Sequence, residues 1–143
     1  MINNNKINFS ILLIRLMVGV VFLSEGIQKF LFPDQLGVGR FIKIGLPAPE
    51  FLGYFVPSFE VVCGLLVLFG LFTRLASIPL IIIMLVAIFS TKIPILLNDG
   101  FWKMAHEART DWAMLLGSII LLIASAGKYS IDFYRSRHSG KKD

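Results

Sequence analysis

One apolar run, residues 7–32, carries three ionisable side chains and constrains how the rest of the chain can fold. At about 1.5 Å per helical residue, the run is long enough to cross the hydrocarbon core of a bilayer, which is about 30 Å thick. It nevertheless contains Arg15, Glu25 and Lys29. A charge at mid-membrane costs on the order of 3 kcal/mol or more, so such groups persist where they face a protein interior and find partners. The remaining segments must therefore pack around this helix.

Composition places the whole chain in a membrane. Of the 143 residues, 56% are hydrophobic and 16% are charged, and the mean hydropathy is +0.77, which is outside the range of soluble domains. The net charge of +5 does not indicate nucleic-acid binding, because the basic residues lie in loops and at the tail. We expect an all-α, membrane-embedded four-helix bundle forming a single domain, with membrane lipid around it. The predicted spans are residues 7–32, 51–72, 75–93 and 111–127.

Proline and polar residues separate the predicted spans. Pro33 ends the first span and Pro94 is predicted to end the third, because proline cannot continue a helix beyond its first turn. Outer loops are predicted at residues 33–50 and 94–110, the first of them holding a short helix on the membrane surface around Phe41. The last stretch, 128–143, is predicted to be a basic tail. We expect the first span to be retained rather than cleaved as a signal peptide.

The distribution of basic residues predicts the topology. Lysine and arginine are enriched in the short cytoplasmic segments next to membrane spans. An arrangement with both termini in the cytoplasm places the larger and denser set of basic residues on the cytoplasmic side. That set is Lys6, Arg74, Lys128, Arg135, Arg137, Lys141 and Lys142, against Arg40, Lys43, Lys92, Lys103 and Arg109 outside.

The charges inside the spans predict their own partners. Glu25 and Lys29 lie one helical turn apart and can pair with each other. Arg15 is about 15 Å from Glu25 along the helix axis, so it needs a partner from another helix. Glu60, the only charge of the second span, is predicted to lie within about 5 Å of the depth of Arg15. We predict an Arg15–Glu60 ion pair, and the alternative interpretation gives that pair a purely structural role in fixing helix register.

A second polar group is predicted in the outer half of the bundle. Here Glu25, Lys29 and Asp111 could converge with a charged run on one pocket open to the outer face. Together with neighbouring aromatic residues, such a pocket suits a ligand with polar carbonyl groups and an apolar tail, as a quinone has. The alternative is a set of interfacial charges that reach water. The charged run consists of His106, Glu107 and Arg109.

The chain lacks the residue patterns of several kinds of cofactor-binding and catalytic site. His106 and His138 are the only histidines and are predicted on opposite sides of the membrane, so they cannot form a pair of axial haem ligands. There is no metal-ligand spacing, phosphate-binding glycine loop or nucleophile elbow, and we expect no metal and no cofactor within the chain. Cys63 is the only cysteine, which excludes an intrachain disulfide. The glycines within the spans are predicted to allow close helix packing.

The order of several short motifs resembles the DoxX family of small four-helix membrane proteins. The resemblance covers about Phe9 to Phe133, and its first motifs are Ile14-Arg15-Leu16 with Gly19 and Gly26-Ile27-Gln28-Lys29-Phe30. The later motifs are Gly45-Leu46-Pro47, Glu60 with Gly64 and Gly70, Thr73-Arg74-Leu75-Ala76, and Tyr129-Ser130-Ile131-Asp132. The residues of the family pattern correspond here to Arg15, Gly26, Lys29, Glu60, Arg74 and Asp132. Asp111 matches an acidic residue that the family has at the start of the fourth helix. In the segment before that helix, the charged run stands where the family often has a glycine-rich sequence.

The resemblance implies a multi-pass protein of a bacterial-type cytoplasmic (inner) membrane. Some relatives are subunits of quinone-linked oxidoreductases, and others are membrane partners in thiol or oxidative-stress complexes. The first hypothesis is therefore a membrane subunit with quinone as substrate and a partner protein subunit as electron source. A non-catalytic scaffold or assembly factor is the alternative, and a homo-oligomer is compatible with either. A small-solute transporter is less favoured, because four helices leave little space and the halves show no repeat.

Overall fold

The computed structural model of the chain describes residues 4–139, which form helices and connecting turns without any strand. The four long helices are α1 (Asn4–Leu31), α4 (Pro49–Phe69), α5 (Thr73–Ala87) and α8 (Arg109–Ala124). The short helices are α2 (Pro33–Leu36), α3 (Val38–Lys43), α6 (Ile93–Asp99), α7 (Phe101–Glu107) and α9 (Ile131–Ser139), and a π-helical segment, η1 (Ile88–Lys92), joins α5 to α6.

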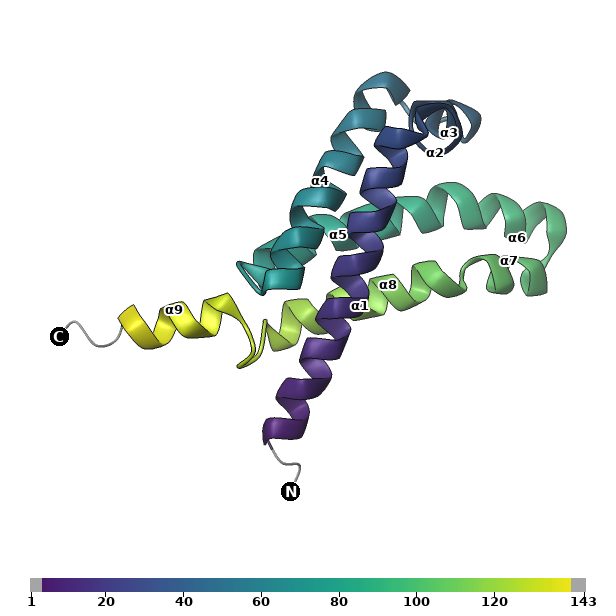
Figure 1. The fold of residues 1–143 in the computed structure, drawn as a ribbon. Helices are drawn as coiled ribbons and strands as arrows, with labels where there is room; N and C mark the ends of the chain where they lie inside the picture. The colour runs from purple at the N-terminus through teal and green to yellow at the C-terminus, as the bar shows by residue number, and fades with distance from the viewer. Residues whose placement is uncertain (1–3, 140–143) are drawn as a thin grey trace.

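Two helix pairs cross at the centre of the molecule. One pair is α1 with α4, and the other is α5 with α8 (Figure 1). A buried apolar cluster lies at the crossing and draws residues from all four helices. It consists of Ile11, Val18, Phe22, Cys63, Val67, Ala76, Leu80, Met114 and Leu121. The fold is therefore an all-helical bundle with one core.

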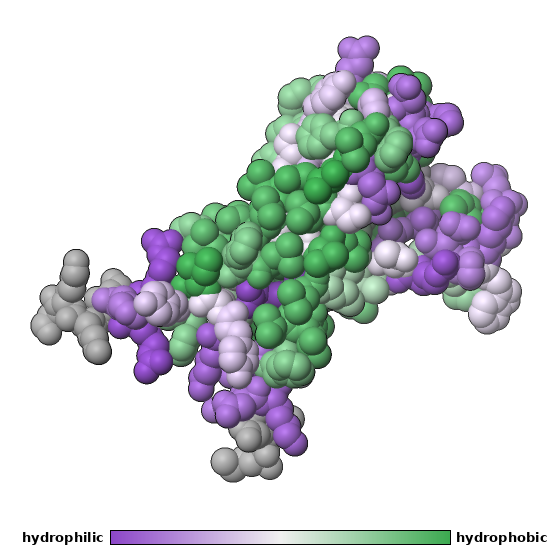
Figure 2. Space-filling model, viewed as in Figure 1, coloured by the Kyte–Doolittle hydropathy of each residue, from purple (hydrophilic) through white to green (hydrophobic). Residues whose placement is uncertain are grey.

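Three helical segments are long and apolar enough to cross a membrane. They are α1, α4 and the continuous stretch Thr73–Asp99. Hydrophobic residues cover the middle of the molecule, whereas hydrophilic residues gather at the α6–α7 end and at the two chain ends (Figure 2). The fourth expected span, α8, has 16 residues, or about 24 Å of helix, so the number of four spans stays a prediction.

The start of α1 and the end of α9 lie on the same side of the molecule, away from α2, α3, α6 and α7 (Figure 1). This arrangement agrees with two termini on one side of the membrane. Which side that is stays a prediction from the basic residues.

The third helix does not end at Pro94, so that prediction is wrong. It passes through η1 into α6 and continues to Asp99. The π-helical turn places Pro94 in the first turn of α6, where the missing N–H of proline has no helical partner to lose. The hydroxyl of Ser90 donates to the carbonyl of Val86 and that of Thr91 to the carbonyl of Ala87, which further stabilises the turn. The predicted outer loop 94–110 is consequently helical apart from the turns at Gly100 and Ala108.

The connecting segment 33–50 and the tail also contain helices. Segment 33–50 holds α2 and α3, which confirms the short helix predicted around Phe41, and α3 packs against α4 with Phe41 buried; its position at the membrane surface stays a prediction. The predicted tail forms α9, which Asp132 joins to the bundle. The N–H groups of Phe72 and Thr73 donate to the Asp132 carboxylate over 3.0 and 3.3 Å, and the N–H of Asp132 donates to Gly70 O over 3.0 Å. The sequence beyond residue 139 lies outside the described residues.

Glycines set the register between α1 and α4. A Cβ on Gly64 would lie 2.9 Å from Leu23 N and 3.1 Å from Gly19 O, and a Cβ on Gly26 would lie 2.9 Å from Pro57 O. These are backbone neighbours, so neither contact can be relieved by rotating a side chain. The prediction that these glycines allow close helix packing is confirmed.

Replacing Gly64 by alanine is expected to destabilise the bundle by about 1–3 kcal/mol, because the added methyl group pushes α1 and α4 apart. Thermal unfolding of the purified protein in detergent micelles measures the effect. Val20→Leu is the matched control, since it adds volume on the exposed face of α1 and should change stability by less than about 0.5 kcal/mol. Equal unfolding temperatures for the two variants would contradict the register.

Candidate functional site

Three charged side chains form an interhelical cluster between α1 and α4. Lys29 Nζ lies 2.9 and 2.7 Å from the two carboxylate oxygens of Glu60 and 3.8 Å from a carboxylate oxygen of Glu25. The side chain of Glu60 is 2% exposed and that of Lys29 is 12% exposed, whereas that of Glu25 is 51% exposed. We call Glu25, Lys29 and Glu60 the Lys29 cluster. It is a buried ion pair with a second carboxylate on its open side.

The helix contact at Gly26 positions this cluster. A Cβ on Gly26 would lie 3.0 Å from the Cβ of Glu60, so only glycine lets the Glu60 backbone come so close. Lys29 follows Gly26 by almost one turn, and its long side chain reaches the Glu60 carboxylate. Glu25 lies one turn before Lys29, which confirms the predicted pairing of these two residues. With all three groups ionised, the cluster carries one more negative than positive charge.

Arg15 has a different set of partners. Its guanidinium donates to Val67 O over 3.0 Å and Leu68 O over 2.7 Å at the end of α4, and to Ala126 O over 3.1 Å and Tyr129 O between α8 and α9. The residue is 2% exposed. We call Arg15 with these four carbonyl acceptors the Arg15 anchor. A cation here also offsets the partial negative charge at the end of α4.

The predicted Arg15–Glu60 ion pair is therefore wrong. The prediction took the ends of the apolar runs as the membrane boundaries, which put the two residues at nearly the same depth. In the structure, the Gly19–Gly64 contact places Arg15 beside Val67, seven residues beyond Glu60 on α4, which corresponds to about 11 Å. Lys29, and not Arg15, forms the ion pair with Glu60.

The predicted outer pocket does not form as one site. Asp111 pairs with Lys92, whose Nζ lies 3.1 Å from the Asp111 carboxylate. His106, Glu107 and Arg109 are exposed, and within residues 4–139 Arg109 donates only to the nearby carbonyl of His106. The α7 end of the molecule also diverges from the α2–α3 end (Figure 1). Of the candidates, only Glu25, Lys29 and Glu60 are brought together.

The Lys92–Asp111 pair was missed by the sequence analysis. Lys92 is 8% exposed at the end of η1, and Asp111 lies in the first turn of α8. The available signal was a lone lysine near the end of a long apolar run, followed by an acidic residue at the start of the next one. Placing residue 92 beside a loop hid this signal, because a loop lysine needs no partner.

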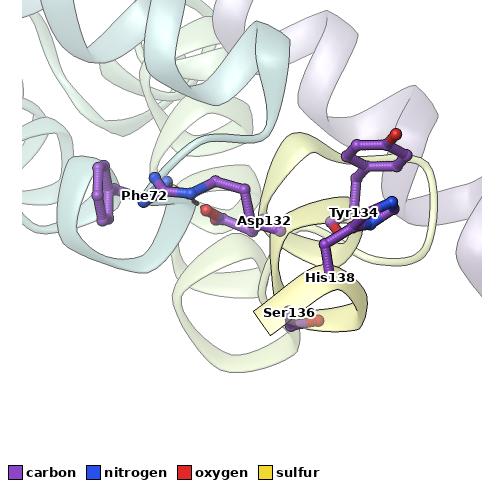
Figure 3. Close-up of a pocket in the computed structure, with 6 residues that line it drawn as sticks. Phe72, Asp132, Tyr134, Ser136 and His138 are labelled. Atoms are coloured by element: carbon purple, nitrogen blue, oxygen red, sulfur yellow. Dashed lines mark hydrogen bonds between the residues drawn. The ribbon is translucent and has the colours of Figure 1, made fainter. Parts of the chain in front are cut away.

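Hollows also lie outside the Lys29 cluster. An apolar groove of about 430 Å³ runs between α4 and α5, and Cys63, a free buried thiol, contributes to its wall. A wider pocket of about 590 Å³ lies at α9 (Figure 3). Among residues 4–139, no three or more histidine, cysteine or acidic side chains are grouped to hold a metal ion.

Comparison with known proteins connects this arrangement to a family. The DoxX family profile matches residues 10–93. The chain is 54% identical over 129 residues to the uncharacterised membrane protein Rv3486 of Mycobacterium tuberculosis, covering 86% of this chain and 79% of the relative. It is 30% identical over 132 residues to a Bacillus subtilis protein named "Putative oxidoreductase CatD", covering 90% of this chain and 89% of the relative. No solved structure gives a significant match.

Proposed function

Because the chain belongs to the DoxX family of membrane proteins, we propose that it is the membrane subunit of a quinone-linked oxidoreductase. It crosses the cytoplasmic (inner) membrane several times, with both termini in the cytoplasm. Electrons come from a redox centre of a partner subunit, because a chain with one cysteine has no dithiol of its own. The oxidoreductase named among the relatives supports a redox role. The Lys29 cluster is the observation that carries the proposal.

The cluster provides the groups that quinone reduction needs. A quinone takes up electrons and protons in equal number to become a quinol, and the first electrons place negative charge on its oxygens. The Lys29 ammonium, held by Glu60, can donate a hydrogen bond to such an oxygen. Glu25 is half exposed and can pass protons inward from outside the cluster. Ionisable residues within membrane spans mark proton relays and substrate pathways in many membrane proteins.

A scaffold or assembly factor is the second candidate. The Arg15 anchor favours it, because this buried charge is used entirely on the protein's own carbonyls. The α6–α7 hairpin adds a surface for a partner, since the side chains of Leu97, Phe101 and Trp102 are 77%, 58% and 83% exposed. Under this alternative, the Lys29 cluster contributes only to stability.

Quinone content separates the two candidates. The complex is purified gently from its native membrane, and its extracted lipids and bound proteins are identified by mass spectrometry. We expect stoichiometric quinone in the wild type and at least a tenfold loss in Glu60→Gln and Glu25→Gln. Glu107→Gln, which changes an exposed glutamate on α7, is the control and should retain quinone. Partner proteins without quinone in the wild type would overturn the proposal and favour the scaffold.

A further inference from the structure

The surface around α9 has unused hydrogen-bond donors next to a pocket. The pocket is lined by Phe72, Asp132, Tyr134, Arg135, Ser136 and His138. Phe72 and Asp132 lie on one side of this site, and Tyr134 with His138 lies on the other (Figure 3). It is open and lies where α5 begins, away from the Lys29 cluster. No role in the proposed quinone reaction accounts for it.

Two arginines of α9 rest on aromatic rings. The guanidinium carbon of Arg135 lies 5.5 Å from the centre of the Phe72 ring, and that of Arg137 lies 5.8 Å from the centre of the Phe133 ring. Within residues 4–139, neither guanidinium has a hydrogen bond or ion pair in addition to this ring contact. A ring covers only one face of a guanidinium, so the N–H donors at its edge stay available. Such a planar edge matches the oxygens of a phosphate group.

The one carboxylate of the pocket, Asp132, forms no ion pair with these arginines among the described residues. Both oxygens of Asp132 accept hydrogen bonds from the backbone N–H groups of Phe72 and Thr73 at the start of α5. Lys128 adds a third exposed basic side chain next to α9. The surface thus carries a positive charge that the described residues leave without a counter-ion.

The place of this surface in the molecule identifies its anionic partner. Phe72 directly precedes the apolar stretch Thr73–Asp99, and the exposed rings of Tyr129 and Tyr134 lie near it. Tyrosines at the end of a membrane span mark the level of the lipid headgroups. Hydrophilic α9 adjoins the hydrophobic middle of the molecule (Figure 2). Clusters of basic residues next to a span attract anionic lipid.

We propose that Arg135 binds the headgroup phosphate of an anionic phospholipid at this pocket, that Arg137 on the opposite face of α9 adds attraction to the same lipid layer, and that together they hold α9 at the membrane surface. The lipid's phosphate accepts hydrogen bonds from the guanidinium edge of Arg135, and Tyr134, which lines the same pocket, can donate its hydroxyl to the headgroup. The proposal rests on the position of α9 and not on the quinone reaction. The two can therefore fail independently.

Native mass spectrometry of the full chain in detergent tests the proposal by titration with phosphatidylglycerol or phosphatidylcholine. We expect phosphatidylglycerol to bind more tightly, and Arg135→Ala with Arg137→Ala to weaken it about thirtyfold, which corresponds to about fivefold for each basic residue near the surface. Arg40→Ala with Lys43→Ala removes the same charge from exposed positions on α3 and should leave binding unchanged. Arg135→Lys with Arg137→Lys keeps the charge without the planar edge, and we expect an intermediate loss.

Three outcomes would overturn the proposal. They are wild-type affinity for phosphatidylglycerol in the alanine variant, equal binding of phosphatidylcholine, and displacement of the lipid by millimolar inorganic phosphate, which would assign the site to a free phosphate. Thermal unfolding of each variant checks that the bundle is intact. Both arginines are exposed, so we expect little change there.

Discussion

Arg15→Ala is expected to prevent the bundle from folding stably, with a loss of more than about 4 kcal/mol. The variant removes all four hydrogen bonds of the Arg15 anchor, and each bond to a charged group contributes about 1.5–3 kcal/mol. It also removes the guanidinium donor from the buried carbonyl of Ala126, whereas Val67 O keeps the N–H of Gly70. Because domains have a total stability of only about 5–15 kcal/mol, this loss is a large share. Denaturant unfolding in micelles, together with size-exclusion chromatography, measures it.

Two variants distinguish the anchor from a general effect of charge. Arg15→Lys keeps the charge but cannot reach carbonyls on both sides of α1 with a fork of donors, so we expect it to recover only part of the stability. Arg109→Ala removes an exposed arginine that donates to a carbonyl three residues away and should cost less than about 0.5 kcal/mol. Similar stabilities of Arg15→Ala and Arg109→Ala would contradict the anchor.

Lys29→Ala is expected to cost about 3–5 kcal/mol, because it leaves the Glu60 carboxylate buried without its partner. Lys29→Leu combined with Glu60→Leu should recover most of this loss, since two apolar side chains can replace a buried ion pair at little cost. Unfolding of the two single leucine variants and the double variant gives a double-mutant cycle. We expect a coupling free energy of several kcal/mol, on the scale of the loss for a buried pair.

The exposed pair of Lys103 and Asp99 supplies the matched cycle. These side chains are 57% and 42% exposed and lie on either side of the turn at Gly100, so their coupling should be about 0.2–1 kcal/mol, as for other exposed ion pairs. A coupling this small for Lys29 and Glu60 would show that their ion pair is solvated in the folded protein, against the structure described above.

Periodicity and composition predicted much of this fold. The apolar runs predicted α1 and α4 to within a few residues, because a long apolar stretch has one low-energy form in a bilayer. The pairing of Glu25 with Lys29 followed from helix geometry alone. The packing role of Gly26 and Gly64 followed from the preference of membrane helices for small residues at contacts.

Three features had no readable signal. The partners of Arg15 are backbone carbonyls, which every residue has, so no residue type marks them. The depth of Arg15 relative to Glu60 depends on which glycines of α1 and α4 contact each other. This register is a tertiary contact that the sequence alone does not specify. The π-helical turn that carries the chain past Pro94 leaves no known composition signal. The sequence thus predicted the four long helices and one part of the Lys29 cluster, while tertiary contacts decided the rest.

The central claim is that the Lys29 cluster acts on quinone and is not only structural. The most direct test is partner-dependent quinone reduction by Lys29→Leu with Glu60→Leu, in membranes where the variant is as abundant and as stable as the wild type. We expect the rate to fall at least a hundredfold, because the variant keeps the packing between α1 and α4 but lacks the ammonium and the buried carboxylate. A rate equal to that of the wild type would contradict the claim and leave the cluster a structural role.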